Sequence, residues 1–193
     1  MKNLIPITLV SLILLASAGI YSHAIANNNA VVITGEYSNP DTIPTRHRIY
    51  MRFIWSLRNQ LVDNGFKVFD ESLITLKYPN QGRVRRSDTE IIDIVNHLKT
   101  KRINYLIFFS IRPTFIKSEL NSRVENKTLF KLRVTVRILD VGEGTNKGNF
   151  EVNGALEELP KNCSSPCLME KVGSYAVELA GDVGTLLEGR LRE

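Results

Sequence analysis

The chain has 193 residues, of which 43% are hydrophobic, and its 25 basic and 20 acidic side chains give a net charge of +5. That length suits a single domain with a full core, once a targeting segment at its start is set aside. The mild positive charge does not indicate a nucleic-acid-binding protein, and it makes an anionic envelope surface a candidate partner.

Residues 1–26 have the pattern of a signal peptide. Lys2 supplies a positive start, Leu4–Ala18 is almost wholly apolar, and Ala24–Ala26 is a small-x-small cleavage signal. A retained transmembrane anchor is the alternative, but a proline and several serines disfavour a spanning helix, which needs about 20 apolar residues. We therefore expect a single periplasmic domain over residues 27–193, with no transmembrane anchor after cleavage. Association with the outer membrane stays open.

A strand, a helix and a second strand are predicted next. Ala30–Gly35 is a short apolar, β-branched run that ends in glycine. Over Thr45–Asn64 the apolar residues recur at helical spacing, and the following Gly65 is typical of a helix end. Phe66–Asp70 alternates between polar and apolar residues, as in a strand with one buried face.

A long loop over Glu71–Arg86 then leads to a second helix. The sequence Ser87-Asp88-Thr89-Glu90 has the form of a capping box, in which the serine and the glutamate satisfy backbone donors at the helix start. The core-facing residues expected on this helix are Ile91, Ile92, Val95 and Leu98.

Two strands joined by a polar loop form the centre of the predicted fold. Tyr105–Ile111 is a continuous apolar run, as expected for a strand covered on both faces, and Pro113 is expected to check its pairing. The polar segment Lys117–Lys127 is expected to join the 105–116 strand to a 129–141 strand as an antiparallel hairpin. Phe130–Ile138 alternates throughout, with apolar residues at its even-numbered positions. One face of this second strand should therefore be buried and the other wet.

The last part of the chain predicts a turn, a fifth strand and a final helix. Gly142–Gly148 is a glycine-rich turn, Asn149–Leu156 is the strand, and the helix runs from a Ser165-Pro166 start to about Leu191. The order is β-α-β-α-β-β-β-α. We expect an α/β (α+β) fold with a mixed five-stranded sheet and helices packed on it.

The two cysteines, Cys163 and Cys167, are most simply explained as one disulfide, because an exported protein meets an oxidising compartment. A thiol-redox protein is the alternative. Cys167 would lie in the first turn of the last helix, where the macrodipole favours a reactive thiolate. The three residues between the cysteines argue against it, because exchange enzymes typically have two.

Two further groups of residues are candidates for partner binding. Small residues, among them Gly173, Ala180 and Gly184, share one face of the last helix, which would let the protein's own sheet or a neighbouring subunit approach closely. The basic cluster Arg83, Arg85 and Arg86 is either a solvated loop or a contact for an anionic partner. A small anionic ligand bound by that loop is a further alternative.

No motif for catalysis is evident. The glycine-rich turn lacks the lysine-serine ending of a phosphate loop. His47 and His97 lack partners at metal-ligand spacing, and His47 is expected on a solvated helix surface. We therefore expect no catalytic residue, no metal and no cofactor.

The order of elements resembles the small α/β domain shared by the TolB amino-terminal domain, the curli-secretion lipoprotein CsgG, the LpoB-type activators of peptidoglycan synthases and the middle domain of the flagellar protein FlgT. The resemblance rests on LRNQLVDNGFKVFD (57–70), on Asn104–Ile107 and on RVTVRILDVGEGTNKG (133–148). It implies an exported, non-enzymatic adaptor or assembly protein of a bacterial secretion, flagellar or cell-wall machine. The implied partners are an envelope protein complex or further subunits of the same chain. Unlike several of these proteins, the chain has no cysteine for a lipid anchor near residue 26.

Overall fold

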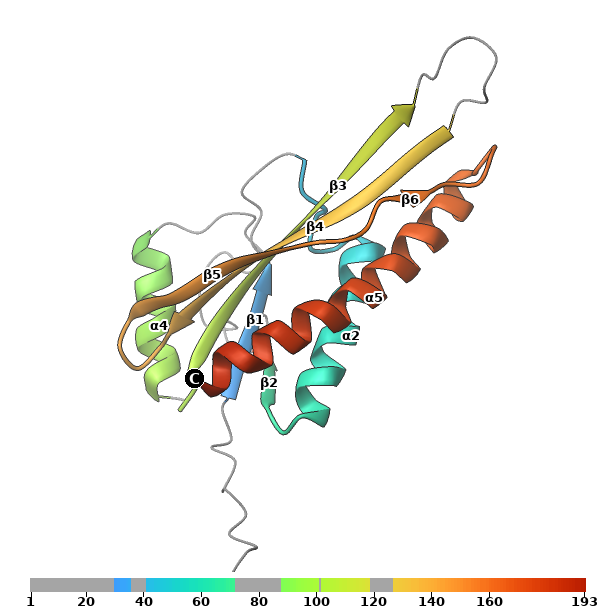
Figure 1. Cartoon of the computed structure of the whole chain (residues 1–193). Helices are drawn as coiled ribbons and strands as arrows, with labels where there is room; N and C mark the ends of the chain where they lie inside the picture. Colours follow the sequence, from blue (N-terminus) through green and yellow to red (C-terminus); the bar gives the residue numbers. More distant parts are fainter. Residues whose placement is uncertain (1–29, 36–40, 72–87, 101, 119–126) are drawn as a thin grey trace, which may run out of the picture.

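The computed structural model describes residues 30–35, 41–71, 88–100, 102–118 and 127–193, which form a mixed sheet with three helices (Figure 1). The elements are β1 (Ala30–Gly35), α2 (Arg48–Asp63), β2 (Lys67–Asp70), α4 (Asp88–Thr100), β3 (Tyr105–Ser118), β4 (Lys127–Asp140), β5 (Thr145–Asn153), β6 (Glu157–Glu158) and α5 (Ser165–Arg192). The predicted fold class and element order are confirmed, and the two-residue β6 is an addition to them. The expected signal peptide lies outside the described residues.

The sheet has the strand order β2-β1-β3-β4-β5, and β6 pairs with the start of β4. β1 pairs in parallel with both β2 and β3, whereas β3, β4 and β5 are antiparallel neighbours. The parallel part needs helical crossovers, and α2 and α4 lie in those connections along the chain. The antiparallel part needs only turns, and a glycine-containing turn joins β4 to β5. This turn is shorter than the predicted Gly142–Gly148, because β5 runs from Thr145 to Asn153 instead of from Asn149 to Leu156.

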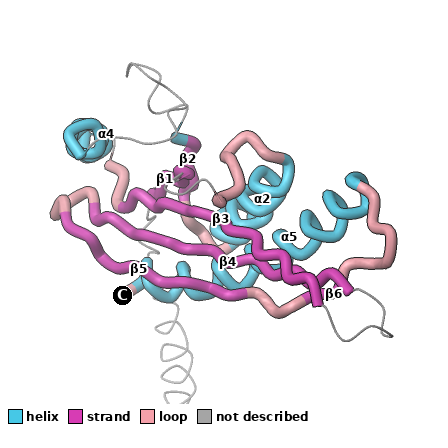
Figure 2. The backbone as a smooth tube through the Cα atoms, turned by 90° about the horizontal axis from the view of Figure 1, so that it is seen from above, coloured by secondary structure: helices cyan, strands magenta, loops and turns pink. Residues whose placement is uncertain are grey.

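The helices cover the two faces of the sheet unequally (Figure 2). α2 and α5 pack together on one face, and their apolar residues share a core with Ile107, Phe109 and the even-numbered residues of β4. α4 packs on the other face, where Val95 and Leu98 are buried with Leu106 and Phe108 of β3. β3 is thus covered on both faces over its first residues, as its continuous apolar run predicts.

The alternation predicted for β4 is confirmed. Leu132, Val134 and Val136 are fully buried, whereas Thr135 between them is exposed. A shift of register by one residue would turn every one of these side chains to the opposite face, so this alternation fixes how β4 sits under α2 and α5.

β3 continues through Pro113 to Ser118, two residues beyond the strand end predicted at Ile116, and Pro113 does not interrupt its pairing. The carbonyl of Ile111 accepts a hydrogen bond from the amide of Ile43, on the edge of β3 that faces away from β4. Peptide groups two residues apart point to the same side of a strand, so Pro113 also turns toward that edge. A proline at such a position lacks only a backbone donor that would point away from β4, so Pro113 keeps its pairing with Leu132 of β4. The prediction that Pro113 checks the pairing of this strand was therefore wrong.

Two helix starts differ from those predicted. α2 begins at Arg48 instead of Thr45, and the imidazole of His47 caps it by accepting a hydrogen bond from the amide of Ile49. His47 is therefore a capping residue and not merely a solvated one. The N-cap of α5 is Ser164, one residue before the predicted Ser165. The predicted capping box of α4, and the side chains of Ile91 and Ile92, lie outside what the structure describes.

The register of β4 predicts a contrast between two neighbouring substitutions. Val134→Asp places an unpaired carboxylate in a fully buried site, and we expect it to abolish cooperative folding. Thr135→Asp adds the same group on the exposed face and should change the free energy of unfolding by less than about 1 kcal/mol. Urea denaturation followed by circular dichroism measures both, and equal damage from the two changes would show that the register is wrong.

Candidate contact surfaces on the paired helices

α2 and α5 lie side by side and run in the same direction. From one polar contact to the next, the residue numbers rise on both helices. The contacts join Arg52 to Glu170, Ser56 to the carbonyl of Val177, Gln60 to the carbonyl of Gly181, and Asn64 to Glu188. The N-terminal ends of both helices therefore lie at one end of the pair. This places two partial positive charges together, since each helix macrodipole is positive at its start.

The small-residue face of α5 packs within the chain. A Cβ atom added at Gly184 would lie 2.2 Å from Oε1 of Gln60, and one at Gly173 would lie 2.6 Å from Nη1 of Arg52. Ala180 is fully buried in the core shared with the sheet. The element that comes close to the two glycines is thus α2, which the sequence analysis did not consider. A contact of this face with a neighbouring subunit stays a prediction.

This packing predicts opposite effects at two glycines of α5. Gly184→Leu would press on Gln60, whose amide donates to the Gly181 carbonyl and to Thr185, and should cost about 1–3 kcal/mol of unfolding free energy. Gly181→Ala meets open space and should stabilise the helix by up to about 1 kcal/mol. Urea denaturation together with light scattering distinguishes packing of α5 within the chain from a contact with a neighbouring subunit. A folded Gly184→Leu variant with unchanged stability and an altered particle size would instead indicate a subunit contact.

A hollow of about 410 Å³ lies where the two helices begin. Arg48 and Arg52 of α2 line one side, and Ser165, Met169 and Glu170 of α5 line the other. Nη2 of Arg52 donates to Oε2 of Glu170 at 2.9 Å, and this hydrogen bond holds the pKa of the Glu170 carboxyl below its ordinary value. The carboxylate is thus engaged by an arginine and is not poised as a general base.

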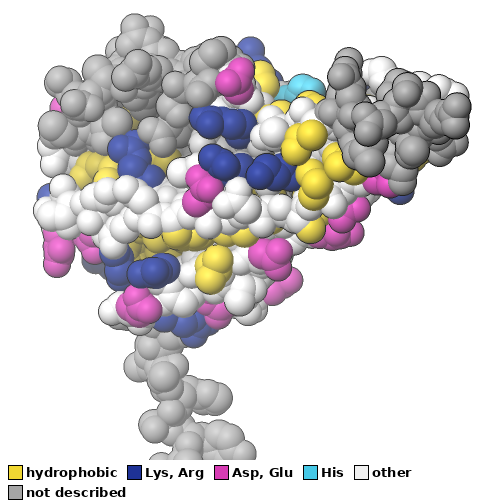
Figure 3. All heavy atoms as spheres, turned by 45° about the horizontal axis from the view of Figure 1, so that its top comes forward, with side chains coloured by type: hydrophobic (Ala, Val, Ile, Leu, Met, Phe, Trp, Pro, Cys, Tyr) yellow, Lys and Arg dark blue, Asp and Glu magenta, His cyan; other side chains and the backbone are white. Residues whose placement is uncertain are grey.

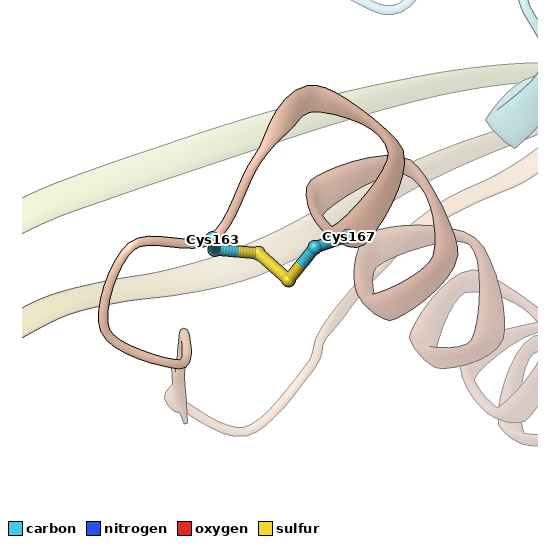
Figure 4. The surroundings of a disulfide bond; sticks show 2 residues. All are labelled: Cys163 and Cys167. Carbon is cyan, nitrogen blue, oxygen red and sulfur yellow. A yellow bond between two sulfur atoms is a disulfide. The ribbon is translucent and has the colours of Figure 1, made fainter.

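The predicted disulfide is confirmed: Cys163, which precedes α5, is bonded to Cys167 in the first helical turn (Figure 4). It staples the irregular segment after β6 to the start of α5. Both cysteines of the chain are used in this bond. The thiol-redox alternative concerns the same pair and stays a prediction.

An apolar stripe on the outer side of α2 was missed by the sequence analysis. Met51, Trp55 and Val62 are 44%, 60% and 49% exposed, and Arg48 and Arg58 lie beside them on the exposed part of the helix. Buried Phe53, Leu57 and Leu61 point to the core, while the α5-facing positions are polar. The sequence contained a signal for this stripe, because Trp55, the single tryptophan of the chain, does not follow the helical spacing of the residues expected in the core.

Tyr175 of α5 fixes the segment between β5 and β6. Its hydroxyl donates to the carbonyl of Ala155 at 2.7 Å, and its ring packs edge-on against Phe130. A Cβ atom at Gly154 would lie 2.3 Å from the hydroxyl, so this approach depends on a glycine there. Burial, followed by the negative charges of nearby carboxylates such as Glu157, raises the pKa of Tyr175.

The raised pKa of Tyr175 predicts a loss of stability in alkaline solution. The folded state holds the phenolic proton more tightly than the unfolded chain does. The resulting contribution to the free energy of unfolding is complete below the ordinary tyrosine pKa of about 10, and it is lost as the pH rises through the pKa of Tyr175 in the folded state. Tyr175→Phe should lower the free energy of unfolding by about 1 kcal/mol at neutral pH, because the hydrogen bond to Ala155 is lost. It should also remove the contribution of Tyr175 to the decrease in stability at alkaline pH. Urea denaturation between about pH 8 and 11 measures it, and an unchanged slope in Tyr175→Phe would assign the effect to other groups.

The basic cluster Arg83, Arg85 and Arg86 lies outside the described residues. Among the residues that are described, no three His, Cys, Asp or Glu side chains come together as metal ligands. In the same part of the chain, no helix combines the length and apolar character needed to cross a membrane.

Comparison with known proteins shows the fold. No family model matches the sequence, and no curated protein matches it. The hypothetical protein CT253 from Chlamydia trachomatis has a similar structure at 9% identity and a TM-score of 0.52, covering 85% of this chain and 98% of that one. At that identity the likeness shows a shared architecture only.

Two similar structures have lower TM-scores. A minor lipoprotein from Acinetobacter baumannii is 12% identical, with a TM-score of 0.48 over 84% of this chain and 94% of that one. The LpoB C-terminal domain from Salmonella enterica is 12% identical, with a TM-score of 0.41 over 76% and 92% of the two chains. LpoB-type activators are among the proteins to which the sequence shows resemblance, but these values assign the chain to no family.

Proposed function

We propose that this chain is an exported, non-enzymatic adaptor of a bacterial envelope machine and that it acts through a protein contact on α2. The observation that carries the proposal is the exposed stripe of Met51, Trp55 and Val62. Scattered apolar residues are normal on a protein surface, but an exposed tryptophan aligned with two further apolar residues on one helix face is typical of a binding surface.

The charges around the stripe favour a particular kind of partner. Arg48 and Arg58 are exposed beside the apolar side chains, while the acidic residues of α5 lie on the other helix of the pair. An envelope protein with an apolar surface rimmed by carboxylates would match the stripe, since complementary charge steers encounter and fixes the register of a complex.

Export is supported by two features of the chain. Residues 1–26 have the pattern of a signal peptide, and Cys163 and Cys167 form a disulfide, a bond that persists in oxidising compartments. Cell fractionation tests this part of the proposal, because the mature chain should be found in the periplasmic or outer-membrane fraction. Recovery of the full-length chain from the cytoplasm would overturn it.

The contact on α2 is tested by crosslinking in living cells. A photoreactive side chain at position 55 should capture one defined envelope protein, whereas the same group at exposed Glu143, in the β4–β5 turn, should not. Reversing charge beside the stripe with Arg58→Glu should reduce the captured product at least about tenfold, as expected for lost charge complementarity.

The controls separate a lost contact from a lost fold. Trp55→Gln replaces a side chain that is 60% exposed, so its free energy of unfolding should stay within about 0.5 kcal/mol of the wild type. A product of twice the chain's mass would identify a second copy as the partner. Equal capture from positions 55 and 143 would remove the support for a specific contact on α2.

A further inference from the structure

One part of the sheet face opposite α2 and α5 is covered neither by α4 nor by any other helix that the structure describes. α4 packs over the start of β3, where Leu106 and Phe108 are buried. Farther along, the register places Ser110, Arg112 and Thr114 of β3 on this same face. Their cross-strand partners on β4 are Thr135, Arg133 and Lys131. Figure 3 looks onto this side of the molecule and shows basic side chains gathered near its middle.

Like charges stand directly opposite each other on this face. Arg112 pairs with Arg133 across the two strands, and Lys131 lies two residues along β4 from Arg133. Such an arrangement is destabilising in the absence of a counter-charge. Glu158 of β6 lies opposite Leu129, at the end of the face beyond Lys131. On β5, Asn149, Glu151 and Asn153 share the face, so β5 offers one carboxylate to the four cations of β3 and β4, with Arg137 included.

That one carboxylate is already engaged. Nε of Arg133 lies 3.3 Å from Oε1 of Glu151 and donates to Oδ1 of Asn153 at 3.2 Å. Asn153 in turn donates to Oε1 of Glu151 at 2.8 Å. The guanidinium of Arg137 lies over the ring of Phe108, 4.4 Å from its centroid, at the end of the face nearest α4. The positive charge of Arg112 and Lys131 thus remains uncompensated by Glu151.

Arg112 carries the observation that points to a ligand. Its Nε is buried and has no hydrogen-bond partner among the residues that the structure describes. Buried side-chain donors in folded proteins nearly always have one, and a charged donor is the costliest to leave unpaired. A missing acceptor next to opposed arginines is best supplied by an anion, because guanidinium groups bind tetrahedral oxyanions through paired N–H donors.

We propose that this open face of β3 and β4 binds a phosphate-type oxyanion between Arg112, Arg133 and Lys131. The hydroxyls of Ser110, Thr114 and Thr135 stand at neighbouring positions of the register and offer further donors. The oxyanion is either free phosphate or the phosphate of a lipid headgroup, which share the same chemistry. The proposal does not depend on the contact at α2, which lies on the other side of the sheet.

The site is tested by titrating the mature chain with inorganic phosphate, using chloride at equal ionic strength as the reference. Calorimetry and thermal melting should show binding and a raised Tm for the wild type and for Arg190→Gln, a matched change at an exposed arginine of α5. Arg112→Gln should weaken phosphate binding about ten- to hundredfold, as expected for a charge-assisted hydrogen bond. Its Tm in chloride should not fall, because the change removes a like-charge pair and an unpaired donor.

Two vesicle preparations distinguish the sources of the phosphate group. Binding to phosphatidylglycerol vesicles but not to phosphatidylcholine vesicles, lost in Arg112→Gln, identifies a lipid headgroup. Phosphate binding without vesicle binding identifies a free anion, and both results support the site. A wild type that responds to neither ligand overturns the proposal, and so does an Arg112→Gln variant that binds as well as the wild type. If Arg112→Gln does not fold, Lys131→Gln tests the same site with the same expected loss.

Discussion

The parallel packing of α5 on α2 determines how the rest of the structure is arranged. Gly173 and Gly184 let side chains of α2 approach the backbone of α5, and Gln60 and Asn64 use that proximity to reach polar groups on α5. The pair then covers the apolar face of β4 with residues such as Phe53, Leu57 and Ala180. With one flank of α2 turned to α5 and another to the sheet, the flank that bears Trp55 is left for solvent or a partner.

The same arrangement explains why the two faces of the sheet differ. The even-numbered residues from Phe130 to Ile138 of β4 are apolar and share a core with α2 and α5, whereas α4 covers only the first part of β3 on the opposite face. β3 and β4 therefore extend past α4, and Ser110, Arg112 and Thr114 of β3 lie there on the side opposite α2 and α5. Arg133 is 39% exposed on this side, whereas Arg112 is partly buried and its Nε has no partner among the described residues, and the register of the two strands places the two cations opposite each other.

Much of this fold can be predicted from local patterns. The alternation over Phe130–Ile138, the helical spacing in α2 and the short first strand are each set by neighbours in the chain, and each was predicted with nearly the right bounds. The effect of Pro113 on the pairing of β3 was not, because it depends on which edge of the strand its nitrogen faces. That direction is fixed by pairing with distant residues, which the local sequence does not contain.

The candidate sites depend even more on distant pairing. The spacing of small residues on α5 predicts a close approach, but nothing in that spacing distinguishes α2 from the sheet or from another subunit. Likewise, Arg112 and Arg133 are far apart along the chain, and only the register of β3 and β4 makes them neighbours. The disulfide was predictable because composition and compartment, and not register, favour the pairing of Cys163 with Cys167.

The two proposed surfaces lie on opposite sides of one sheet and share no residue. The stripe with Trp55 belongs to the helix layer, and the basic face with Arg112 belongs to the side that α4 leaves open. Between them lies the packed core of β3 and β4, whose residues are fully buried and leave little room to deform. Since sites without shared partners act additively, occupancy of one surface should not alter affinity at the other. A rigid domain with two independent surfaces can hold a protein on one side and an anionic group on the other, which is the physical requirement for an adaptor.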